Sequence, residues 1–126
     1  MTSDQRRATS DLAARRCVPC EAGTPPLSRA DAERLMVDVP GWRLLDGEPA
    51  KIERSFKLED FAAAMAFVNT VAAIAEAEGH HPDIHISWNR VRLELFTHAI
   101  GGLSENDFIL AAKINEAKEG GRRDKT

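Results

Sequence analysis

Residues 76–107 read EAEGHHPDIHISWNRVRLELFTHAIGGLSEND and hold all four histidines of this 126-residue chain. Gly79 favours the end of a preceding helix, while Pro82 forbids further helix and biases its neighbour toward an extended backbone. His80 and His81 therefore lie at a predicted junction between a helix and a strand. Because clustered imidazoles exchange protons near neutral pH, any chemistry is predicted to take place here.

The second half of this stretch predicts a β-hairpin. Residues 83–88 and 91–98 flank Asn89–Arg90, which is interpreted as the turn. One face of the hairpin is then buried under helices, and the other meets solvent or a ligand. If the alternation continues to the strand end, His98 lies on that second face. The hairpin thus brings it to the sheet edge where the His80 junction lies.

Upstream of this stretch, the sequence predicts a helix followed by another hairpin. Ser28 caps the helix, which ends by Pro40. Strands at residues 42–45 and 50–56 then flank the turn dipeptide Asp46–Gly47. The two hairpins together predict a four-stranded antiparallel sheet.

The helix predicted at residues 60–77 is apolar over most of its surface. Two apolar stripes run along it, the first formed by Phe61, Met65, Val68, Ala72 and Ala75 and the second by Ala64, Phe67, Val71 and Ile74. Together the two stripes are wider than the apolar surface that a helix needs to pack on one side. This width predicts burial both against the sheet and against a partner subunit. The alternative is that its alanines simply favour an exposed helix.

The globular part is predicted to be one domain at residues 27–118, and 43% hydrophobic residues allow a modest core. Its last helix begins at Ser104, where Asp107 completes a capping-box-like pattern. Two glycines then stop this helix, which leaves a disordered tail at residues 119–126.

Residues 1–26 are polar and end in Gly-Thr-Pro-Pro, so we predict a flexible arm outside the core. It contains both cysteines, Cys17 and Cys20. Their spacing is that of half a zinc site or of a redox pair, although four thiolates would need a second chain. Three interpretations stay open: no functional role, a metal shared across subunits, and reversible oxidation.

Composition narrows the classes of partner. The net charge is −3 and acids and bases are interspersed, which gives no basic stripe for nucleic acid. No apolar run approaches the roughly 18 residues of a membrane span, and no secretory signal is recognisable. Asp4 and Asp11 argue against a mitochondrial transit peptide. We therefore expect a cytoplasmic protein with neither nucleic acid nor a membrane as partner.

The histidines allow two interpretations besides acid-base chemistry. A metal would draw on Asp83, His85 and the adjacent histidines, but neighbouring residues in an extended segment point in opposite directions. No helical HxxxH spacing survives Pro82, and no glycine-rich phosphate loop is present. We therefore predict no metal and no cofactor. The histidines are otherwise simple hydrogen-bonding groups at a helix end and in loops.

The pattern resembles the signature of the pterin-4a-carbinolamine dehydratase family. The matching residues are Glu76, His80, His81, Pro82, Trp88, His98 and Asp107 at their present spacings. Similarity continues through Gly41–Trp42 and Gly102–Leu103 and covers residues 27–116. Gly79 is a departure, since an acidic or polar residue often precedes the first histidine in that family.

The resemblance implies an α+β fold in which three helices pack on one face of a four-stranded antiparallel sheet, assembled as homodimers or homotetramers. It also implies dehydration of 4a-hydroxytetrahydrobiopterin to quinonoid dihydropterin and water, without a cofactor. This reaction recycles the pterin cofactor of aromatic amino-acid hydroxylases. A pterin is then the substrate, and such a hydroxylase is a candidate pathway partner.

By resemblance, His80 and His98 are the catalytic acid-base pair, and His81 joins them by binding and orienting the pterin. The implied substrate-binding residues are Glu76, Pro82, Asp83, Trp42, Trp88 and Asp107. The alternative function is a non-catalytic module, either a dimerisation cofactor of a transcription factor or an assembly factor of a carbon-fixing enzyme. Such a module can lose its histidines, so their presence favours the enzyme.

Overall fold

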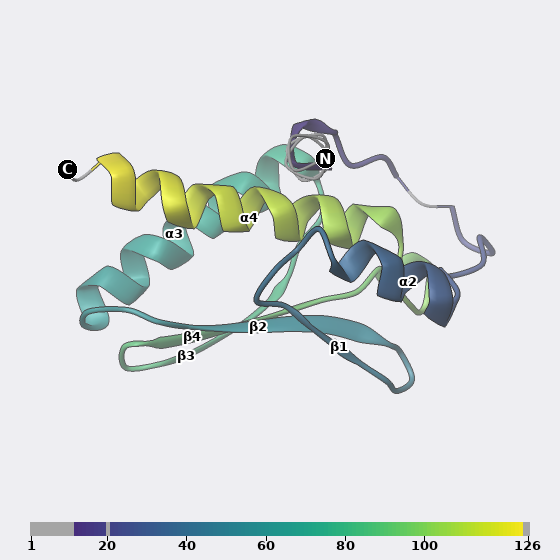
Figure 1. Ribbon diagram of the computed structural model, residues 1–126, viewed down its shortest axis with the longest axis horizontal. Coiled ribbons are helices and arrows are strands. Elements are labelled where there is room, and N and C mark those ends of the chain that lie inside the picture. Colours follow the sequence, from purple (N-terminus) through teal and green to yellow (C-terminus); the bar gives the residue numbers. More distant parts are fainter. Residues whose placement is uncertain (1–11, 20, 125–126) are drawn as a thin grey trace.

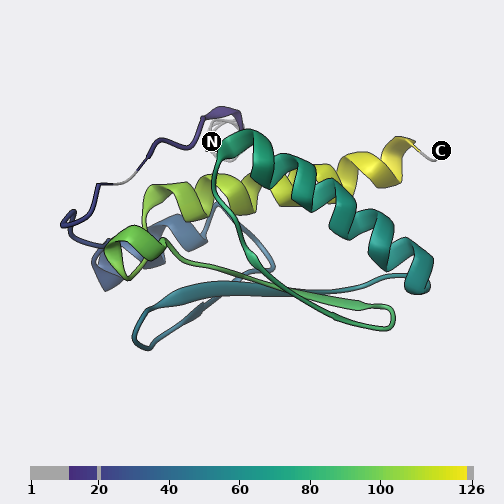
Figure 2. The same ribbon diagram turned by 180° about the vertical axis from the view of Figure 1, so that it is seen from behind.

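The computed structural model describes residues 12–19 and 21–124, with side chains described as far as residue 119. Helices cover one face of a four-stranded sheet, and the other face is open (Figures 1 and 2). This confirms the predicted α+β architecture. The elements in chain order are α2 (Arg29–Met36), β1 (Arg43–Leu45), β2 (Lys51–Lys57), α3 (Phe61–Glu78), β3 (Asp83–Ser87), β4 (Arg90–Leu95), the 3-10 helix η1 (His98–Ile100) and α4 (Glu105–Asp124).

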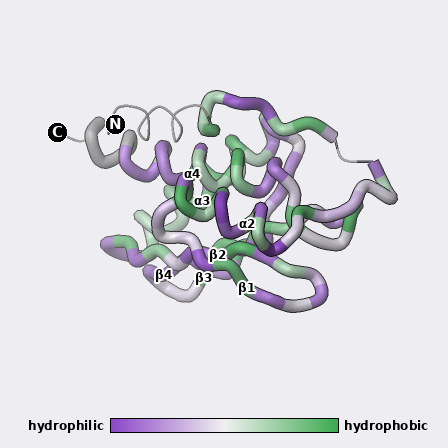
Figure 3. Tube along the Cα trace, turned by 45° about the vertical axis from the view of Figure 1, so that its right-hand side comes forward, coloured by the Kyte–Doolittle hydropathy of each residue, from purple (hydrophilic) through white to green (hydrophobic). Residues whose placement is uncertain are grey.

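The sheet is antiparallel in the order β1-β2-β4-β3, so that β2 and β4 lie at its centre. Ile52 opposes Leu95, and both are buried on the face beneath the helices. Ser55 and Arg92 oppose each other on the open face, as the alternation of side chains requires. In Figure 3, hydrophobic segments of α3 and α4 lie over the sheet, where the core forms.

The turn of the second hairpin differs from the predicted one. Ser87 pairs with Arg90, so the turn residues are Trp88 and Asn89, and Trp88 takes a positive φ of 53°. The Asn89 side chain donates to the carbonyl oxygen of Leu58 at 3.1 Å. The backbone carbonyl oxygen of Asn89 accepts from the Leu58 amide at 2.7 Å. This tertiary anchor sets the turn one residue earlier than the local pattern predicts.

Helix α3 begins and ends as its sequence predicts. The Asp60 side chain accepts from the Ala63 amide at 2.8 Å, and Gly79 closes the helix in the left-handed conformation. The inner face packs on the sheet, where the rings of Phe67 and Phe56 lie 4.7 Å apart. On the other stripe Phe61 is 52% exposed. The two stripes therefore have different surroundings in the single chain.

Within the described part of the chain, α3 alone is long and apolar enough to cross a membrane, judged by length and composition. Core helices of water-exposed domains pass the same test. The packing of Ala64, Phe67 and Val71 against the core assigns α3 to the folded domain.

Helix α4 is longer than predicted. Ser104 and Asp107 form the expected capping box, since the Ser104 amide donates to the Asp107 carboxylate at 2.9 Å. The predicted stop near residue 118 is wrong, because the helix continues to Asp124. A glycine costs a helix about 1 kcal/mol relative to alanine, which weakens a helix without ending it. Residues 125–126 of the predicted tail lie outside the described residues.

The prediction of a flexible arm is wrong for residues 12–19. Leu12 and Ala13 are only 2% and 7% exposed and belong to the hydrophobic core. The Lys113 ammonium donates to the Ala13 carbonyl oxygen at 2.6 Å. This apolar pair is too short to produce a periodic pattern, which is why the sequence did not reveal it. Residues 1–11 and 20 lie outside the described residues.

We expect Leu12→Ala to lower the free energy of unfolding by about 2–4 kcal/mol, because it leaves a cavity in the core. Urea denaturation measures the change. The control is Val37→Ala, whose side chain is 79% exposed and whose loss should change stability by no more than about 0.5 kcal/mol. An unfolding midpoint of Leu12→Ala equal to that of the parent protein would show that the segment does not belong to the core.

Candidate active site

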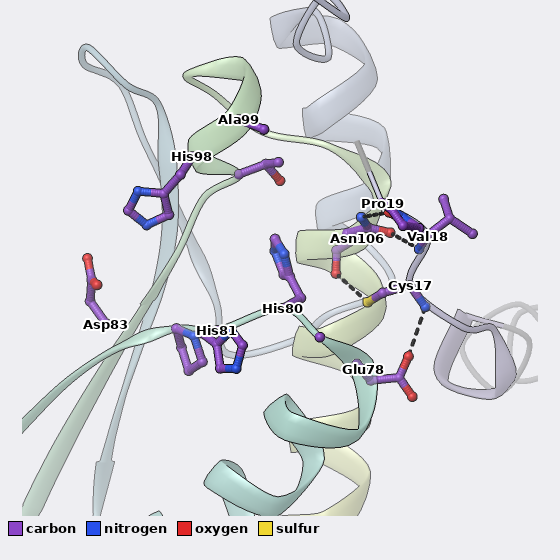
Figure 4. A pocket seen from close by; sticks show the side chains of 13 residues that line it. Cys17, Val18, Pro19, Glu78, His80, His81, Asp83, His98, Ala99 and Asn106 are labelled. Carbon is purple, nitrogen blue, oxygen red and sulfur yellow. Dashed lines mark hydrogen bonds between the residues drawn. The ribbon is translucent and has the colours of Figure 1, made fainter. Parts of the chain in front are cut away.

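A pocket of about 460 Å³ lies where α3 ends, β4 passes into η1 and α4 begins (Figure 4). This volume suits a small organic ligand. It brings together three of the four histidines from two distant parts of the sequence. The lining residues are Cys17, Val18, Pro19, Glu78, Gly79, His80, His81, Pro82, Asp83, Thr97, His98, Ala99 and Asn106.

His80 is fixed by a carboxylate buried behind it. Its Nε2 lies 2.6 Å from Oδ1 of Asp107, and the two side chains are 11% and 0% exposed. The sequence analysis gave Asp107 a substrate-binding role, but the structure places it in the core and not in the pocket lining. Asp107 therefore contacts His80 from behind and does not face the pocket.

The other oxygen of Asp107 is also occupied. Oδ2 accepts from the Thr97 hydroxyl at 2.9 Å and from the Ser104 amide at 2.9 Å. Because two donors already point at this carboxylate, the arrangement favours the His80 tautomer in which Nε2 donates to Oδ1. The second ring nitrogen, Nδ1, is then the one available for proton exchange.

His81 is more exposed than His80 and contacts a carboxylate of α3. Its Nε2 lies 2.7 Å from Oε2 of Glu76, and the two side chains are 60% and 78% exposed. Glu76 does not line the pocket, so it supports His81 and does not itself face a ligand. The exposed position gives His81 freedom to adjust to a ligand.

His98 enters from the other side of the pocket. It is the first residue of η1, and Figure 4 shows it on the strand side while His80 and His81 come from the end of α3. Its ring lies 4.1 Å from the ring of Phe96, which keeps the two residues on the same face, as their parity predicts. The three imidazoles therefore flank one space.

The structure does not bring either predicted tryptophan to this pocket. Trp42 is buried in the core, where its Nε1 donates to Oδ1 of Asn115 at 2.8 Å. Trp88 is 68% exposed in the hairpin turn. That turn follows a full strand from Asp83, which is a separation of roughly 16 Å. Pro82 and Asp83, in contrast, do line the pocket.

The sequence analysis missed the wall formed by Cys17, Val18 and Pro19. Asn106, at the start of α4, holds this wall. Its Oδ1 accepts from the Val18 amide at 3.0 Å, and its Nδ2 donates to the Val18 carbonyl oxygen at 2.5 Å. No motif reveals this pairing, because an amide side chain recognises any extended backbone in the same way.

Electrostatics also fix the wall. Burial alone would raise the pKa of Glu78, but the hydrogen bond from the Cys17 amide and the charges of Lys113 and Arg16 lower it. Burial and the neighbouring Glu78 charge raise the pKa of the Cys17 thiol to about 12. The thiol therefore stays protonated near neutral pH.

The raised pKa of Cys17 bears on the roles that were considered for the two cysteines. A thiol with a raised pKa is a poor nucleophile, so docked Cys17 is a poor fit to a redox role. Cys20 lies outside the described residues. Among the described side chains, no group of three or more His, Cys, Asp or Glu is arranged to hold a metal ion.

Residues 25–117 match the model of the family described as pterin 4 alpha carbinolamine dehydratase. A Methylococcus capsulatus protein whose name assigns it to the same family is 50% identical over 105 residues, covering 83% of this chain and 91% of its own. Pterin-4-alpha-carbinolamine dehydratase 2, mitochondrial, from Arabidopsis thaliana is 49% identical over 110 residues, which cover 85% of this chain and 59% of that protein.

A solved structure is also similar. It is described as a transcriptional coactivator/pterin dehydratase from Brucella melitensis, with a TM-score of 0.68 and 35% identity over 72% of this chain and 96% of that one. A pterin dehydratase-like protein identified as a RuBisCO assembly factor in the alpha-carboxysome has a TM-score of 0.53 and 27% identity, covering 60% and 87% of the two chains.

In a Cys20→Ser background, we expect Cys17 to react with iodoacetamide at pH 8 at least about tenfold more slowly in the folded protein than in urea, because little thiolate is present. Since the pKa is raised on folding, this protection should persist below the ordinary thiol pKa and fade as the pH rises toward 12. Mass spectrometry measures the alkylated fraction. Equal rates in the folded and unfolded protein would contradict the raised pKa of the half-buried thiol.

Proposed function

The chain belongs to the pterin-4a-carbinolamine dehydratase family, and on that premise we propose that it is a hydro-lyase. Its proposed reaction converts 4a-hydroxytetrahydrobiopterin into quinonoid dihydropterin and water. The observation that carries the proposal is the placement of His80 and His98 on two sides of one pocket, with His80 backed by Asp107.

The elimination needs two coordinated proton transfers. The bond between C4a and the hydroxyl oxygen breaks, N5 loses its proton, and the electron pair left on N5 forms a double bond to C4a. The oxygen gains a proton and leaves as water. A neutral imidazole takes one proton while an imidazolium gives the other, so the chain's own residues balance the reaction.

We propose that His80 is the base that removes the proton from N5. Its Nδ1 is available as the base, and the Asp107 carboxylate stabilises the imidazolium that forms. The more exposed His98 protonates the leaving hydroxyl. The cycle closes when solvent returns a proton to His98 and accepts the proton that His80 took from N5. His81, held by Glu76, is proposed to orient the pterin, with Pro82 and Asp83 beside it.

The alternative is a non-catalytic module, as in the relative identified as a RuBisCO assembly factor. The retained histidines and the buried carboxylate behind His80 favour the enzyme, since an assembly surface needs neither. The link to an aromatic amino-acid hydroxylase stays a prediction. So does the cytoplasmic location, because one relative is named mitochondrial.

Metal-stripped protein should accelerate loss of the 4a-hydroxypterin chromophore. His80→Ala or His98→Ala alone should lower kcat by about 10²–10⁴-fold, and the double variant should lose more than either. His81→Ala should mainly raise KM. The control is His85→Ala, which lies outside this pocket. Full activity of the double variant would remove both residues from the chemistry, and activity restored only by added metal would overturn the metal-free mechanism. A parent protein that does not accelerate the reaction would favour the non-catalytic module.

We also propose that a second copy of the chain covers the outer face of α3. Phe61 is 52% exposed there, and Met65 and Val68 on the same stripe are only partly covered. An apolar stripe of this kind is a usual site of subunit contact. The assembly is then a homodimer or a homotetramer.

Light scattering should give at least twice the chain mass of 13.9 kDa. Phe61→Asp should lower the mass toward that of one chain, because the contact would bury an isolated carboxylate. Val37→Asp is the matched control, since Val37 is 79% exposed and lies at the C-cap of α2. A parent protein of single-chain mass at micromolar concentration would exclude the dimer.

A further inference from the structure

We propose that residues 12–19, here called the strap, complete the pterin pocket, and that the docked strap and the bound pterin stabilise each other. The proposal rests on the proposed function, because the ligand is taken to be the pterin. In Figures 1 and 2 the strap is the purple segment beside the C-terminal end of α3.

One end of the strap is anchored in the core. Leu12 is buried, and the Ala13 carbonyl oxygen accepts from Lys113 of α4 at 2.6 Å. Arg15 forms an ion pair with Glu105 at 2.9 Å. These contacts place the beginning of the strap over α4 whether or not a ligand is present.

The other end is held mainly by polar contacts at the pocket itself, and there Arg16 also pairs with Glu78 at 3.4 Å. The Cys17 amide donates to Oε1 of Glu78 at 2.8 Å, and Asn106 pairs with both backbone groups of Val18. Val18 is 63% exposed and buries little apolar area. A segment held by a few hydrogen bonds opens at a much lower cost than the whole domain, so this end can open to admit a ligand.

The strap is coupled to the histidines through shared elements. Asn106 holds the strap, and the next residue of α4, Asp107, holds His80. Glu78 accepts from the strap two residues before His80. Cys17, Val18 and Pro19 line the same pocket as His80 and His98. A pterin in this pocket therefore meets the strap on one side and the acid-base pair on the other.

Linkage then fixes the direction of the effect. If the docked strap contacts the bound pterin, docking raises pterin affinity, and pterin must favour docking by the same factor. The two hydrogen bonds between Asn106 and Val18 are here called the clamp. Loss of this clamp should weaken pterin binding while leaving the acid-base geometry intact. The strap residues thus determine affinity and not the chemical step.

The first test compares two asparagines of α4. Asn106→Ala removes the clamp, whereas Asn115→Ala removes a similar side chain that bonds to Trp42 and the Pro40 carbonyl oxygen away from the pocket. Two part-buried hydrogen bonds are lost, so Asn106→Ala should raise KM and the Kd for 7,8-dihydrobiopterin roughly tenfold. Its kcat should stay within about twofold of the parent value. Asn115→Ala should leave KM and Kd unchanged.

The second test observes docking directly. Trypsin cleavage after Arg16, which is 74% exposed, reports an open strap, and mass spectrometry detects the fragment that begins at Cys17. Saturating 7,8-dihydrobiopterin should slow this cleavage severalfold, and Asn106→Ala should accelerate it. Val18→Pro removes the N–H group that donates to Oδ1 of Asn106 and leaves the sequence of α4 unchanged. It therefore tests the same contact even if Asn106→Ala does not fold.

The outcomes separate the two proposals. If the parent protein dehydrates the carbinolamine but Asn106→Ala and Val18→Pro keep its KM, and pterin does not slow cleavage, the strap proposal is overturned alone. If the parent protein neither binds 7,8-dihydrobiopterin nor dehydrates the carbinolamine, the proposed function is overturned, and the strap's role in it falls as well. A higher KM together with pterin-protected cleavage supports both.

Discussion

The site depends on one buried carboxylate. Asp107 accepts hydrogen bonds from the Thr97 hydroxyl and the Ser104 amide, and it fixes His80 through Nε2. A buried charge is costly unless its oxygens are occupied, and here each of them is. The end of β4, the start of α4 and the end of α3 must therefore meet around this group. The position of the histidines follows from satisfying that requirement.

The local signals in the sequence were reliable where a side chain forms a hydrogen bond with a backbone group two or three residues away. Ser28, Asp60 and Ser104 each accept a hydrogen bond at the start of a helix, and Gly79 ends α3 in the left-handed conformation. Because these contacts lie within a few residues, the sequence shows both partners. The junction that carries the histidines was predictable for the same reason.

The features that were not predictable depend on residues far apart in the chain. Asn106 bonds to the backbone of Val18, and any residue type at that position offers the same backbone groups. The sequence therefore does not reveal this contact. Trp42 fills the core because Asn115 supplies an acceptor for its indole, and Trp88 enters the turn because Leu58 anchors Asn89. Sequence similarity to a family marks such residues as important without telling which of them face the pocket.

The two walls of the pocket have different chemical characters, and this matters for selective inhibition. The histidine side offers the imidazoles of the family-like signature, whereas the Cys17–Pro19 side offers backbone and apolar groups held by Asn106. A compound that contacts only the imidazoles would bind any protein with the same signature. A compound extended toward Pro19 would discriminate among such proteins by the strap that each one carries.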